Sequence, residues 1–384
     1  MTGKSVTRRQ FLRHAGATAA MLGLSEALIP QLAGALQQLA TSGKPAVIWI
    51  QGQSCTGCSV SFLNSNYPSV ADLVINKLSV RYHPTLMAGT GRTAVQAIED
   101  TVAGAGEGQP FVLVAEGPVP TAEDGHYCTF GLGDGTKTVM DKTVPNDKTY
   151  AQWLDELAPA AAAVIANGNC AAFGGIPGAN AKTTGATAIS EYVKKVDAKK
   201  TVINVGGCPS HPDWFVGTVM EALISLGLLP GGKGRLSLDK YGRSRTFFGQ
   251  LIHENCERRP AFDAGLFLQD WNQQDPDMKL CMFKKGCKGP VTYADCCVRR
   301  WNSKVSWCVG AGAPCHGCAE PTFYQELAPL YEPLANVSLP GVSTSADIAG
   351  WVAAGATAVG IGAHYLYKQL GEKEPKESSE GGER

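Results

Sequence analysis

The segment Ala46-Val-Ile-Trp-Ile50, followed closely by Gly52-Gln-Ser-Cys55-Thr-Gly-Cys58, decides the fold. Its first part is a short apolar run, which predicts a buried strand, and its second part predicts a loop that carries cysteine chemistry. Similar apolar runs occupy residues 111–114, 162–166 and 201–205, and each ends just before a loop that holds cysteine or glycine. These four runs predict four strands.

Helix-like stretches lie between the predicted strands, at residues 70–78, 93–102, 150–157, 187–196 and 216–226. Strands that alternate with helices predict an α/β fold with a parallel sheet. In such sheets the binding site gathers at the carboxyl ends of the strands. We therefore expect an α/β domain over residues 45–230 with its site at that edge.

A second, irregular domain is predicted over residues 231–328. This segment is rich in glycine and proline, has no clear periodicity, and contains eight of the thirteen cysteines. A segment of this kind needs something other than a large apolar core to hold it. The sequence contains no internal repeat.

Composition excludes two broad classes of protein. The chain has 384 residues, with 34 Lys and Arg against 34 Asp and Glu. Without a basic excess, a nucleic-acid partner held by phosphate electrostatics is not expected. Hydrophobic content of 44% with 18% charged residues excludes a disordered chain. Thirteen is an odd number of cysteines, so at least one has no disulfide partner within the chain.

Four cysteines follow the ends of predicted strands. Cys55 and Cys58 follow the first strand, Cys170 follows the third within Gly168-Asn-Cys170, and Cys208 follows the fourth after two glycines. Loops that converge at one sheet edge bring four thiolates around one compact centre, and glycines let the backbone approach inorganic sulfide. Four thiolates suit an iron–sulfur cluster or structural zinc.

The second domain contains two more groups of metal-ligand residues. In the first group, His253 and Cys256 are three positions apart and share one face of a turn, and Cys281 and Cys287 follow. The second group consists of Cys308, Cys315 and Cys318 together with either Cys296 or Cys297. Cys128 and one of the 296/297 pair are left over. The alternatives are three zinc sites, or disulfides with buried free thiols. Three grouped sites in one chain suit electron transfer better than a scaffold.

The N-terminus resembles an export signal. Ser5-Val-Thr-Arg8-Arg9-Gln-Phe-Leu-Arg13 precedes a modestly apolar stretch, and the adjacent arginines followed by Phe-Leu indicate the twin-arginine route. We therefore expect a twin-arginine signal peptide over residues 1–40; the alternative is an ordinary amphipathic helix. This route exports folded proteins, so cysteines that already hold metal are favoured over disulfides.

A second apolar segment lies near the C-terminus. Residues 348–367 contain no Asp, Glu, Lys or Arg and have the length that a bilayer requires, with aromatic residues near both ends. They predict a transmembrane anchor; the alternative is a buried or surface helix, because Ala and Gly dominate. Residues 329–347 are then a linker and residues 368–384 a polar tail on the cytoplasmic side.

The chain resembles the small, electron-transferring subunit of periplasmic nickel–iron hydrogenases over residues 45–323. The motifs that carry this resemblance are Trp49-Ile-Gln-Gly-Gln-Ser-Cys55-Thr-Gly-Cys58-Ser, Glu116-Gly-Pro-Val-Pro-Thr121, Gly168-Asn-Cys170-Ala-Ala-Phe-Gly-Gly175, Gly207-Cys208-Pro-Ser-His-Pro-Asp-Trp214, Phe248-Gly-Gln-Leu-Ile-His253-Glu-Asn-Cys256 and Gly286-Cys287-Lys-Gly-Pro290. The resemblance implies a flavodoxin-like domain followed by a cluster-rich domain. It also implies a large subunit that holds the Ni–Fe centre, so that this chain has no catalytic residue of its own.

The resemblance implies three iron–sulfur clusters and their ligands. The proximal 4Fe–4S cluster is assigned to Cys55, Cys58, Cys170 and Cys208. The distal 4Fe–4S cluster is assigned to His253, Cys256, Cys281 and Cys287, and the medial cluster to Cys296, Cys308, Cys315 and Cys318. Many members have proline at the position of Cys308 and a 3Fe–4S medial cluster. The cysteine here implies 4Fe–4S, as in the selenium-containing branch.

Other features of the family limit the expectations. Oxygen-tolerant members have two extra cysteines beside the proximal cluster; here Gly57 occupies one position and only Cys128 remains, so a six-cysteine site is not expected. The predicted anchor implies a membrane cytochrome b or another electron carrier on the periplasmic side of the cytoplasmic membrane. The competing identities are the related quinone-reductase subunit of respiratory complexes, which carries one cluster, and a metal-stapled binding protein.

Overall fold

The computed structural model describes residues 44–66, 68–179, 181–227, 236–273, 279–324, 337–339, 342–344 and 346–371. The chain forms two compact units, Met1–Glu332 and Pro333–Arg384. The predicted signal peptide at residues 1–40 lies outside the described residues, as do residues 372–384 of the predicted tail. The predicted boundary near residue 230 falls inside the first unit and stays a prediction.

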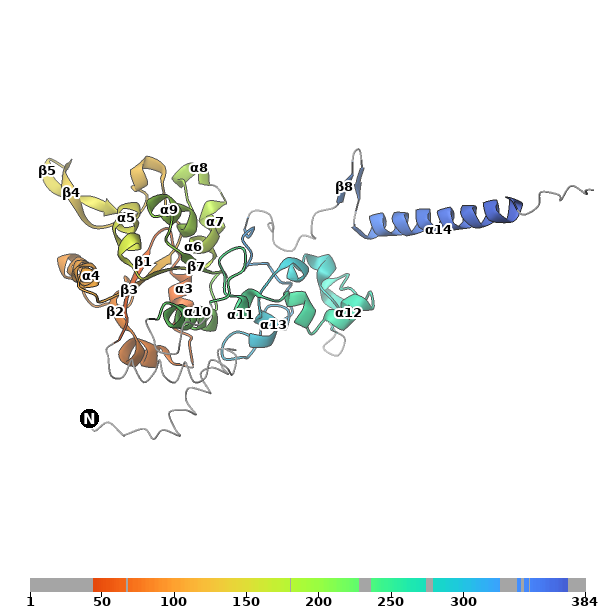
Figure 1. Ribbon diagram of the computed structural model, residues 1–384, viewed down its shortest axis with the longest axis horizontal. Helices are drawn as coiled ribbons and strands as arrows, with labels where there is room; N and C mark the ends of the chain where they lie inside the picture. Colours follow the sequence, from red (N-terminus) through yellow and green to blue (C-terminus); the bar gives the residue numbers. More distant parts are fainter. Residues whose placement is uncertain are drawn as a thin grey trace, which may run out of the picture. The chain divides into compact units, whose positions relative to one another are not determined.

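A five-stranded parallel sheet organises the first unit (Figure 1). Its strand order is β2-β1-β3-β6-β7, which is the flavodoxin-like order. The strands are β1 (Ala46–Gln51), β2 (Ser79–Tyr82), β3 (Phe111–Glu116), β6 (Ala163–Asn167) and β7 (Val202–Val205). The predicted parallel α/β fold is therefore confirmed, and all four predicted strands are present.

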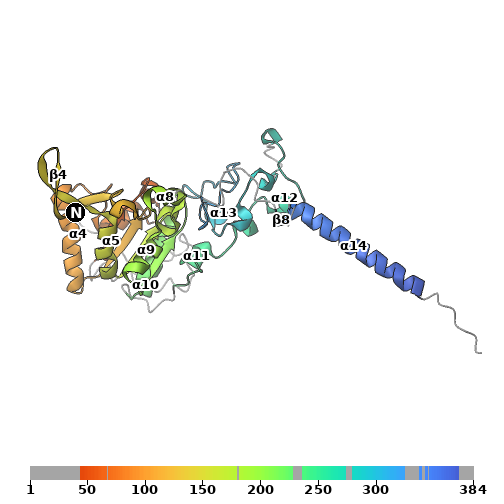
Figure 2. The same ribbon diagram turned by 90° about the horizontal axis from the view of Figure 1, so that it is seen from above.

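The central strands have no solvent-facing side. Every residue of β3 and β6 is buried, which explains why their sequences are continuous apolar runs without alternation. Helices flank the sheet in both views (Figure 1, Figure 2). They include α3 (Gly57–Phe62), α4 (Gly91–Gly106), α5 (Tyr150–Ala160), α6 (Asn169–Phe173), α9 (Ile189–Val196) and α10 (Pro212–Ser225).

Alternate strand residues belong to two separate apolar clusters. Ile48 and Leu113 pack with residues of α4, α5 and α9, whereas Val47 and Val112 pack with α3 and α10. The second cluster continues into the cysteine-rich part of the chain, because it contains Cys296 and Cys315. The core of the sheet is thus continuous with the irregular segment.

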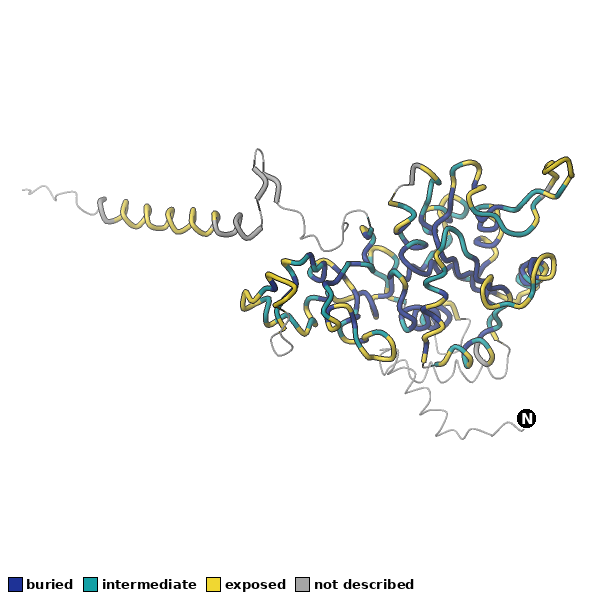
Figure 3. The backbone as a smooth tube through the Cα atoms, turned by 180° about the vertical axis from the view of Figure 1, so that it is seen from behind, coloured by how far each residue is buried: buried dark blue, intermediate teal, exposed yellow. Residues whose placement is uncertain are grey.

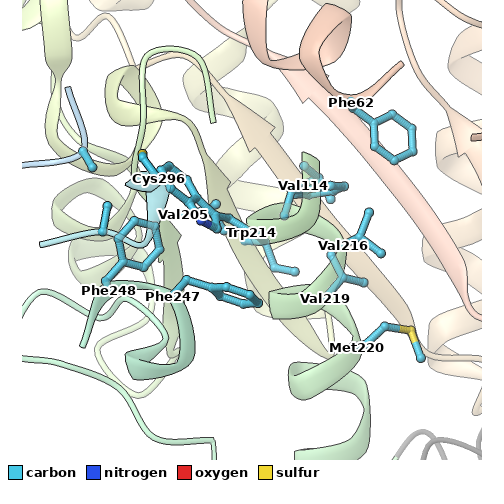
Figure 4. Packing of buried hydrophobic residues seen from close by; sticks show 14 of the residues in the cluster. Phe62, Val114, Val205, Trp214, Val216, Val219, Met220, Phe247, Phe248 and Cys296 are labelled. Carbon is cyan, nitrogen blue, oxygen red and sulfur yellow. The ribbon is translucent and has the colours of Figure 1, made fainter. Parts of the chain in front are cut away.

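Trp214 is the most deeply buried of the three tryptophans in that shared core. It is fully buried, and its ring lies 5.0 Å from that of Phe248. Figure 4 shows Cys296 at the same end of the cluster as Phe248 and Val205. The start of α10 follows from its sequence, because Pro212 stands in the first turn and the His211 side chain accepts a hydrogen bond from the Asp213 N–H.

Three strands of this unit were not predicted. β2 has only four residues and carries Arg81 at the edge of the sheet. β4 (Thr129–Val139) and β5 (Lys142–Thr149) form an antiparallel hairpin rich in glycine and charged residues. The predicted helix at residues 70–78 is a π-helix, η2 (Asp72–Lys77).

Short helices and turns make up the described residues 236–273 and 279–324. The helices of this segment are α11 (Arg245–Phe248), η4 (Ile252–Asn255), α12 (Arg259–Asp263), η5 (Trp271–Gln273), η6 (Phe283–Lys285), η7 (Gly289–Val291) and α13 (Cys296–Arg299). Three more short helices precede it in the chain: η3 (Ala122–Gly125), α7 (Gly175–Gly178) and α8 (Ala181–Thr184). Many of the residues between the helices of this segment are buried (Figure 3). The ion pair between Arg299 and Asp213 connects this segment to α10, and the shared apolar cluster connects it to the sheet.

The second unit contains β8 (Val337–Leu339), β9 (Val342–Thr344) and the long helix α14 (Ala346–Gly371). The two strands pair within the predicted linker at residues 329–347. α14 has 26 residues, and the tube is coloured as exposed along most of its described length (Figure 3).

α14 contains residues 348–367, which the sequence predicts to form a transmembrane anchor. Within the described part of the chain, no helix combines the length and the apolar character needed to cross a membrane. The segment was predicted from its length and its lack of charge. Alanine and glycine supply twelve of the 26 residues of α14, and they add little hydropathy.

Candidate functional site

Three of the loops at the carboxyl edge of the sheet carry cysteine. The loop after β1 contains Cys55 and leads into α3, whose second residue is Cys58. Cys170 lies in α6 directly after β6, and Cys208 follows β7. Since β1, β3, β6 and β7 are parallel neighbours, their ends meet at one edge. The structure thus brings together the loops that the sequence predicted.

The sulfur atoms of three of these cysteines interact. The side-chain hydrogen bond with Cys208 lowers the pKa of Cys170 to about 7. Burial raises the pKa of Cys58 to about 12, with smaller contributions from Glu116 and Cys170. Cys55 is exposed at the rim. These mutual influences show that Cys58, Cys170 and Cys208 lie close together at this edge of the sheet.

Glycines leave room for these sulfur atoms. A Cβ at Gly168 would lie 2.2 Å from the Cys58 Sγ, and a Cβ at Gly175 would lie 2.9 Å from the Cys170 Sγ. The backbone also connects two of the loops, because the Asn169 N–H donates to the Gly207 carbonyl over 2.7 Å. The prediction that glycines let the backbone approach the site fits this geometry.

Glu116 lies at the end of β3, in the middle of this edge, and its side chain is buried. Its carboxylate accepts hydrogen bonds from six donors: Trp49 Nε1, Gln51 Nε2, Ser54 Oγ, the Ser59 hydroxyl and the Cys58 and Ser59 N–H groups. These bonds tie β1, the Cys55 loop and α3 to β3. The sequence analysis assigned no role to Glu116. The feature that could have indicated one is a carboxylate at the end of a continuous apolar strand.

His83 extends the same network. Its Nε2 lies 3.3 Å from the Ser59 Oγ, and its Nδ1 lies 3.0 Å from the Thr85 Oγ1. Burial lowers its pKa to about 4, although the nearby Glu116 acts in the opposite direction. The imidazole is therefore neutral at pH 7 and supports the Cys58 helix without adding charge. Nothing in the sequence singled this histidine out.

The four residues predicted for the distal cluster line one pocket. His253, Cys256, Cys281 and Cys287 all border the same small, apolar hollow. The His253 Nε2 is buried and has no hydrogen-bond partner. A buried ring nitrogen without a partner fits a metal ligand, because an unsatisfied polar atom is otherwise costly. The ring is held by an edge contact with Phe262, whose centroid is 4.4 Å away.

Cys296, Cys315 and Cys318, three of the residues predicted for the medial cluster, lie together in the buried part of the segment. Burial, followed by the charges of Cys318 and Cys315, raises the pKa of Cys296 well above its usual value. Burial, followed by the charges of Cys287, Cys318 and Cys308, does the same for Cys315. Cys308 is exposed. All four residues are therefore close enough to interact.

The neighbouring Cys297 points elsewhere. Burial raises its pKa to about 11, and its next largest influence is Cys256, which belongs to the distal group. Adjacent side chains on α13 thus face different groups, and the geometry favours Cys296 over Cys297 for the medial group. Cys128 is half-buried, and its Sγ lies 3.7 Å from the Gln51 carbonyl oxygen.

The donor sets fit iron–sulfur clusters. All thirteen cysteines are free thiols, so the predicted alternative of disulfides is not found. Among the described residues, no three His, Cys, Asp or Glu side chains converge as ligands of a single metal ion. Cluster ligands need no such convergence, because each thiolate binds a different iron atom. Thiolate and imidazole ligands at glycine-rich loops suit this chemistry.

A scan of protein families identifies the class of protein that the fold and the cysteine loops define. Residues 55–222 match the family "NADH ubiquinone oxidoreductase, 20 Kd subunit", so the sheet and its cysteine loops belong to an oxidoreductase subunit. Residues 248–331 match the family of the C-terminal part of the NiFe/NiFeSe hydrogenase small subunit. The second match distinguishes a hydrogenase from the quinone-reductase alternative, because it covers the cysteine-rich segment.

The chain belongs to the family of nickel–iron hydrogenase small subunits. It is 38% identical to the periplasmic [NiFeSe] hydrogenase small subunit of Desulfomicrobium baculatum, over 85% of this chain and 99% of that protein. It is 35% identical to the quinone-reactive Ni/Fe-hydrogenase small chain of Wolinella succinogenes, over 96% and 97%.

A solved structure supports the same family. The [NiFeSe] hydrogenase of Desulfovibrio vulgaris Hildenborough in the oxidized state is similar with a TM-score of 0.66 and 42% identity, over 76% of this chain and 99% of that one. An electron-relay role follows from the family. A small subunit of this family works with a large subunit, and hydrogenase activity is expected of the pair.

Proposed function

We propose that this chain relays electrons through three cubane iron–sulfur clusters between the H2-splitting site of its large subunit and an acceptor. An iron–sulfur cluster, when bound, takes up and releases single electrons. The chain itself holds and insulates these centres. The observation that carries the proposal is the distal pocket, where four expected ligands converge and the buried His253 Nε2 has no other partner.

Each cluster has its proposed ligands. Cys55, Cys58, Cys170 and Cys208 hold the proximal cluster; His253, Cys256, Cys281 and Cys287 hold the distal cluster; Cys296, Cys308, Cys315 and Cys318 hold the medial cluster. Hydrogen bonds from the backbone support a spatial order in which the medial group lies between the proximal and the distal groups. The Cys208 N–H contributes a hydrogen bond to Cys318, and the Cys315 N–H donates to the Cys287 Sγ over 3.3 Å. Neighbouring groups are thus in direct contact.

Iron and acid-labile sulfide analysis of the purified heterodimer tests the number of clusters. Three cubanes require about twelve iron atoms per small subunit in addition to the iron of the large subunit, whereas structural zinc gives one metal ion per site and no sulfide. A count of about four would instead match a single cluster and contradict the proposal.

The medial cluster is proposed to be 4Fe–4S, because Cys308 supplies a fourth thiolate. Cys308→Pro should then convert it to 3Fe–4S, and Cys297→Ala is the matched control that should leave it unchanged. Electron paramagnetic resonance of the oxidised heterodimer distinguishes the two cluster types. A 3Fe–4S signal of one spin per molecule in the unaltered protein would show that Cys308 is not a ligand.

Export by the twin-arginine route and a periplasmic location are part of the proposal. The motif at Arg8 and Arg9 supports it, and a relative is named as periplasmic. Replacement of both arginines by lysine should retain the protein in the cytoplasm, because lysine lacks the planar donor geometry of arginine. Normal periplasmic fractionation of the double variant would exclude this route.

The electron acceptor is proposed to be a membrane cytochrome b or another carrier. The support is the relative from Wolinella succinogenes, which is named as quinone-reactive. Co-purification of a b-type haem with the heterodimer after mild detergent extraction tests this part. Quantitative recovery of a haem-free heterodimer that reduces only soluble carriers would contradict it.

A further inference from the structure

Arg243 is a buried cation that none of the proposed ligand sets uses. Its side chain is 1% exposed. The guanidinium contacts two carboxylates, with its Nε 2.8 Å from Asp239 and its Nη1 3.3 Å from Glu320. The same Nη1 donates a hydrogen bond to the Ala319 carbonyl over 2.7 Å. A guanidinium this deeply buried is stable only with such partners, because an unpaired buried charge is costly.

The backbone of Arg243 extends the sheet beyond β7. Asn204 forms a parallel bridge with Arg243, and the Asn204 N–H donates to the Gly242 carbonyl over 2.9 Å. Cys208 follows Asn204 by four positions. Arg243 is therefore anchored beside the strand that leads to the proximal group, while its guanidinium reaches residues next to the medial group.

The Ala319 carbonyl lies between the two groups. It directly follows Cys318 in the sequence, and a Cβ at Gly206 would lie 2.7 Å from its oxygen. The oxygen is thus held between the Gly206 backbone and the Arg243 guanidinium. This arrangement fixes the loop of Cys318 against the loop of Cys208, and the Asn169 Nδ2 adds bonds of 3.0 Å to the Glu320 and Phe323 carbonyls.

Glu320 connects the same cation to a third segment. Its Oε1 accepts a hydrogen bond from the Tyr293 N–H over 2.6 Å, in addition to the contact with Arg243. Tyr293 precedes Cys296 by three positions. The Arg243 guanidinium and the Glu320 carboxylate are both buried, so solvent and salt screen their charges poorly. Each charge is therefore expected to change the electrostatic potential at the site between Cys296 and Cys318.

We propose that Arg243 positions the medial cluster and that the Arg243–Glu320 pair sets its reduction potential. The proposal rests on the proposed function, since it requires Cys296 and Cys318 to be cluster ligands. Nearby charge is one of the properties that determine the potential of an iron–sulfur cluster. Loss of the cation makes the surroundings more negative and the cluster harder to reduce. Loss of the carboxylate charge makes it easier to reduce.

Redox titration of the complete heterodimer, followed by electron paramagnetic resonance of the medial centre, tests this proposal. Arg243→Gln should lower the medial potential, and Glu320→Gln should raise it. The variant with both changes should return close to the unaltered value. Arg243→Lys keeps the charge, so its potential should stay near the starting value even though the Ala319 contact is weakened.

Arg92→Gln is the matched control. Arg92 also forms an arginine–carboxylate pair, with Glu99 at 2.8 Å, but on the exposed surface of α4. Its removal should leave the medial potential unchanged. A merely structural role of Arg243 would not produce shifts of opposite sign for the two members of one pair.

The outcomes separate this inference from the proposed function. Unshifted potentials, or shifts of the same sign, in Arg243→Gln and Glu320→Gln heterodimers with full iron content overturn the role of the pair. If Arg243→Gln loses the medial centre altogether, Glu320→Gln still decides the sign of the shift, and Arg243→Lys still decides whether the charge alone keeps the potential at its starting value. Absence of a medial signal and of its iron in the unaltered heterodimer overturns the ligand assignment itself, and the inference with it.

Discussion

Gly168→Ala should remove the proximal cluster while leaving the rest of the chain folded. Gly168 has φ 88° and ψ 158°, a region of backbone conformation that is essentially restricted to glycine. A residue with a side chain pays about 1–3 kcal/mol to adopt such a conformation. The larger effect is steric, because the new Cβ would lie 2.2 Å from the Cys58 Sγ.

The displacement of the sulfur follows from this distance. Non-bonded heavy atoms are in optimal contact at about 3.5–4.0 Å, so the Cys58 sulfur has to move by roughly 1.5 Å. Functional sites require their ligands to lie within about 0.5 Å of the productive geometry. We therefore expect Cys58 to be lost as a ligand, and the iron content to fall by about four atoms per chain.

The assay compares iron, sulfide and H2-driven dye reduction in the purified heterodimer. Gly178→Ala is the matched control, because this glycine lies nearby in α7 and a Cβ there meets nothing within 4 Å. The control should retain full iron and full activity. If Gly168→Ala retains the same iron and the same proximal signal as the control, Cys58 either is not a ligand or is not held against residue 168.

Three further changes probe other parts of the chain. Gly217→Ala places a Cβ 2.3 Å from the Phe247 ring. We expect this overlap to lower the free energy of unfolding by about 1–3 kcal/mol, although alanine is usually favoured over glycine in a helix by about 1 kcal/mol. A higher melting temperature for this variant would contradict the packing of Gly217 against Phe247. His253→Ala should lower the iron content by about one to four atoms per chain. Its melting temperature should change little, because the Nε2 has no protein hydrogen bond to lose; unchanged iron would exclude His253 as a ligand. Trp214→Phe removes the donor that lies 2.6 Å from the Asp295 carboxylate and should cost about 1–3 kcal/mol; an unaltered denaturation midpoint would contradict this.

The sheet was predictable where its strands are buried on both faces. β3 and β6 have continuous apolar sequences because helices cover both sides, and such runs are visible in the sequence. β2 escaped prediction because an edge strand of four residues with Arg81 gives no apolar run. The β4–β5 hairpin escaped because its stability comes from cross-strand pairing of polar residues.

The site was predictable to the level of loops and groups. Strand ends indicated the neighbourhood of Cys55, Cys170 and Cys208, because parallel topology brings such ends to one edge. Spacing alone left Cys296 and Cys297 as alternatives, since adjacent positions in a turn differ only in direction, and the assignment of Cys296 came from the family resemblance. Contacts such as Arg243 with Glu320 were not predictable, because the two residues are 77 positions apart and no sequence spacing connects them.

The anchor prediction for residues 348–367 depends on length and absence of charge. Neither criterion measures apolar character, and alanine and glycine supply twelve of the 26 residues of α14.

The hydrogen bonds from Asn169 to the Glu320 and Phe323 carbonyls also determine when the site can form during synthesis. Asn169 and Glu320 are 151 positions apart, and a ribosome that adds about 5–20 residues per second needs roughly 8–30 s to cover that interval. Throughout this time the thiols at residues 58 and 170, and later the thiol at residue 208, lack the segment that contains Glu320 and Phe323. Exposed thiols oxidise readily when the surroundings are oxidising. We therefore expect these thiols to stay available as ligands only where the surroundings are reducing until residue 323 has been synthesised.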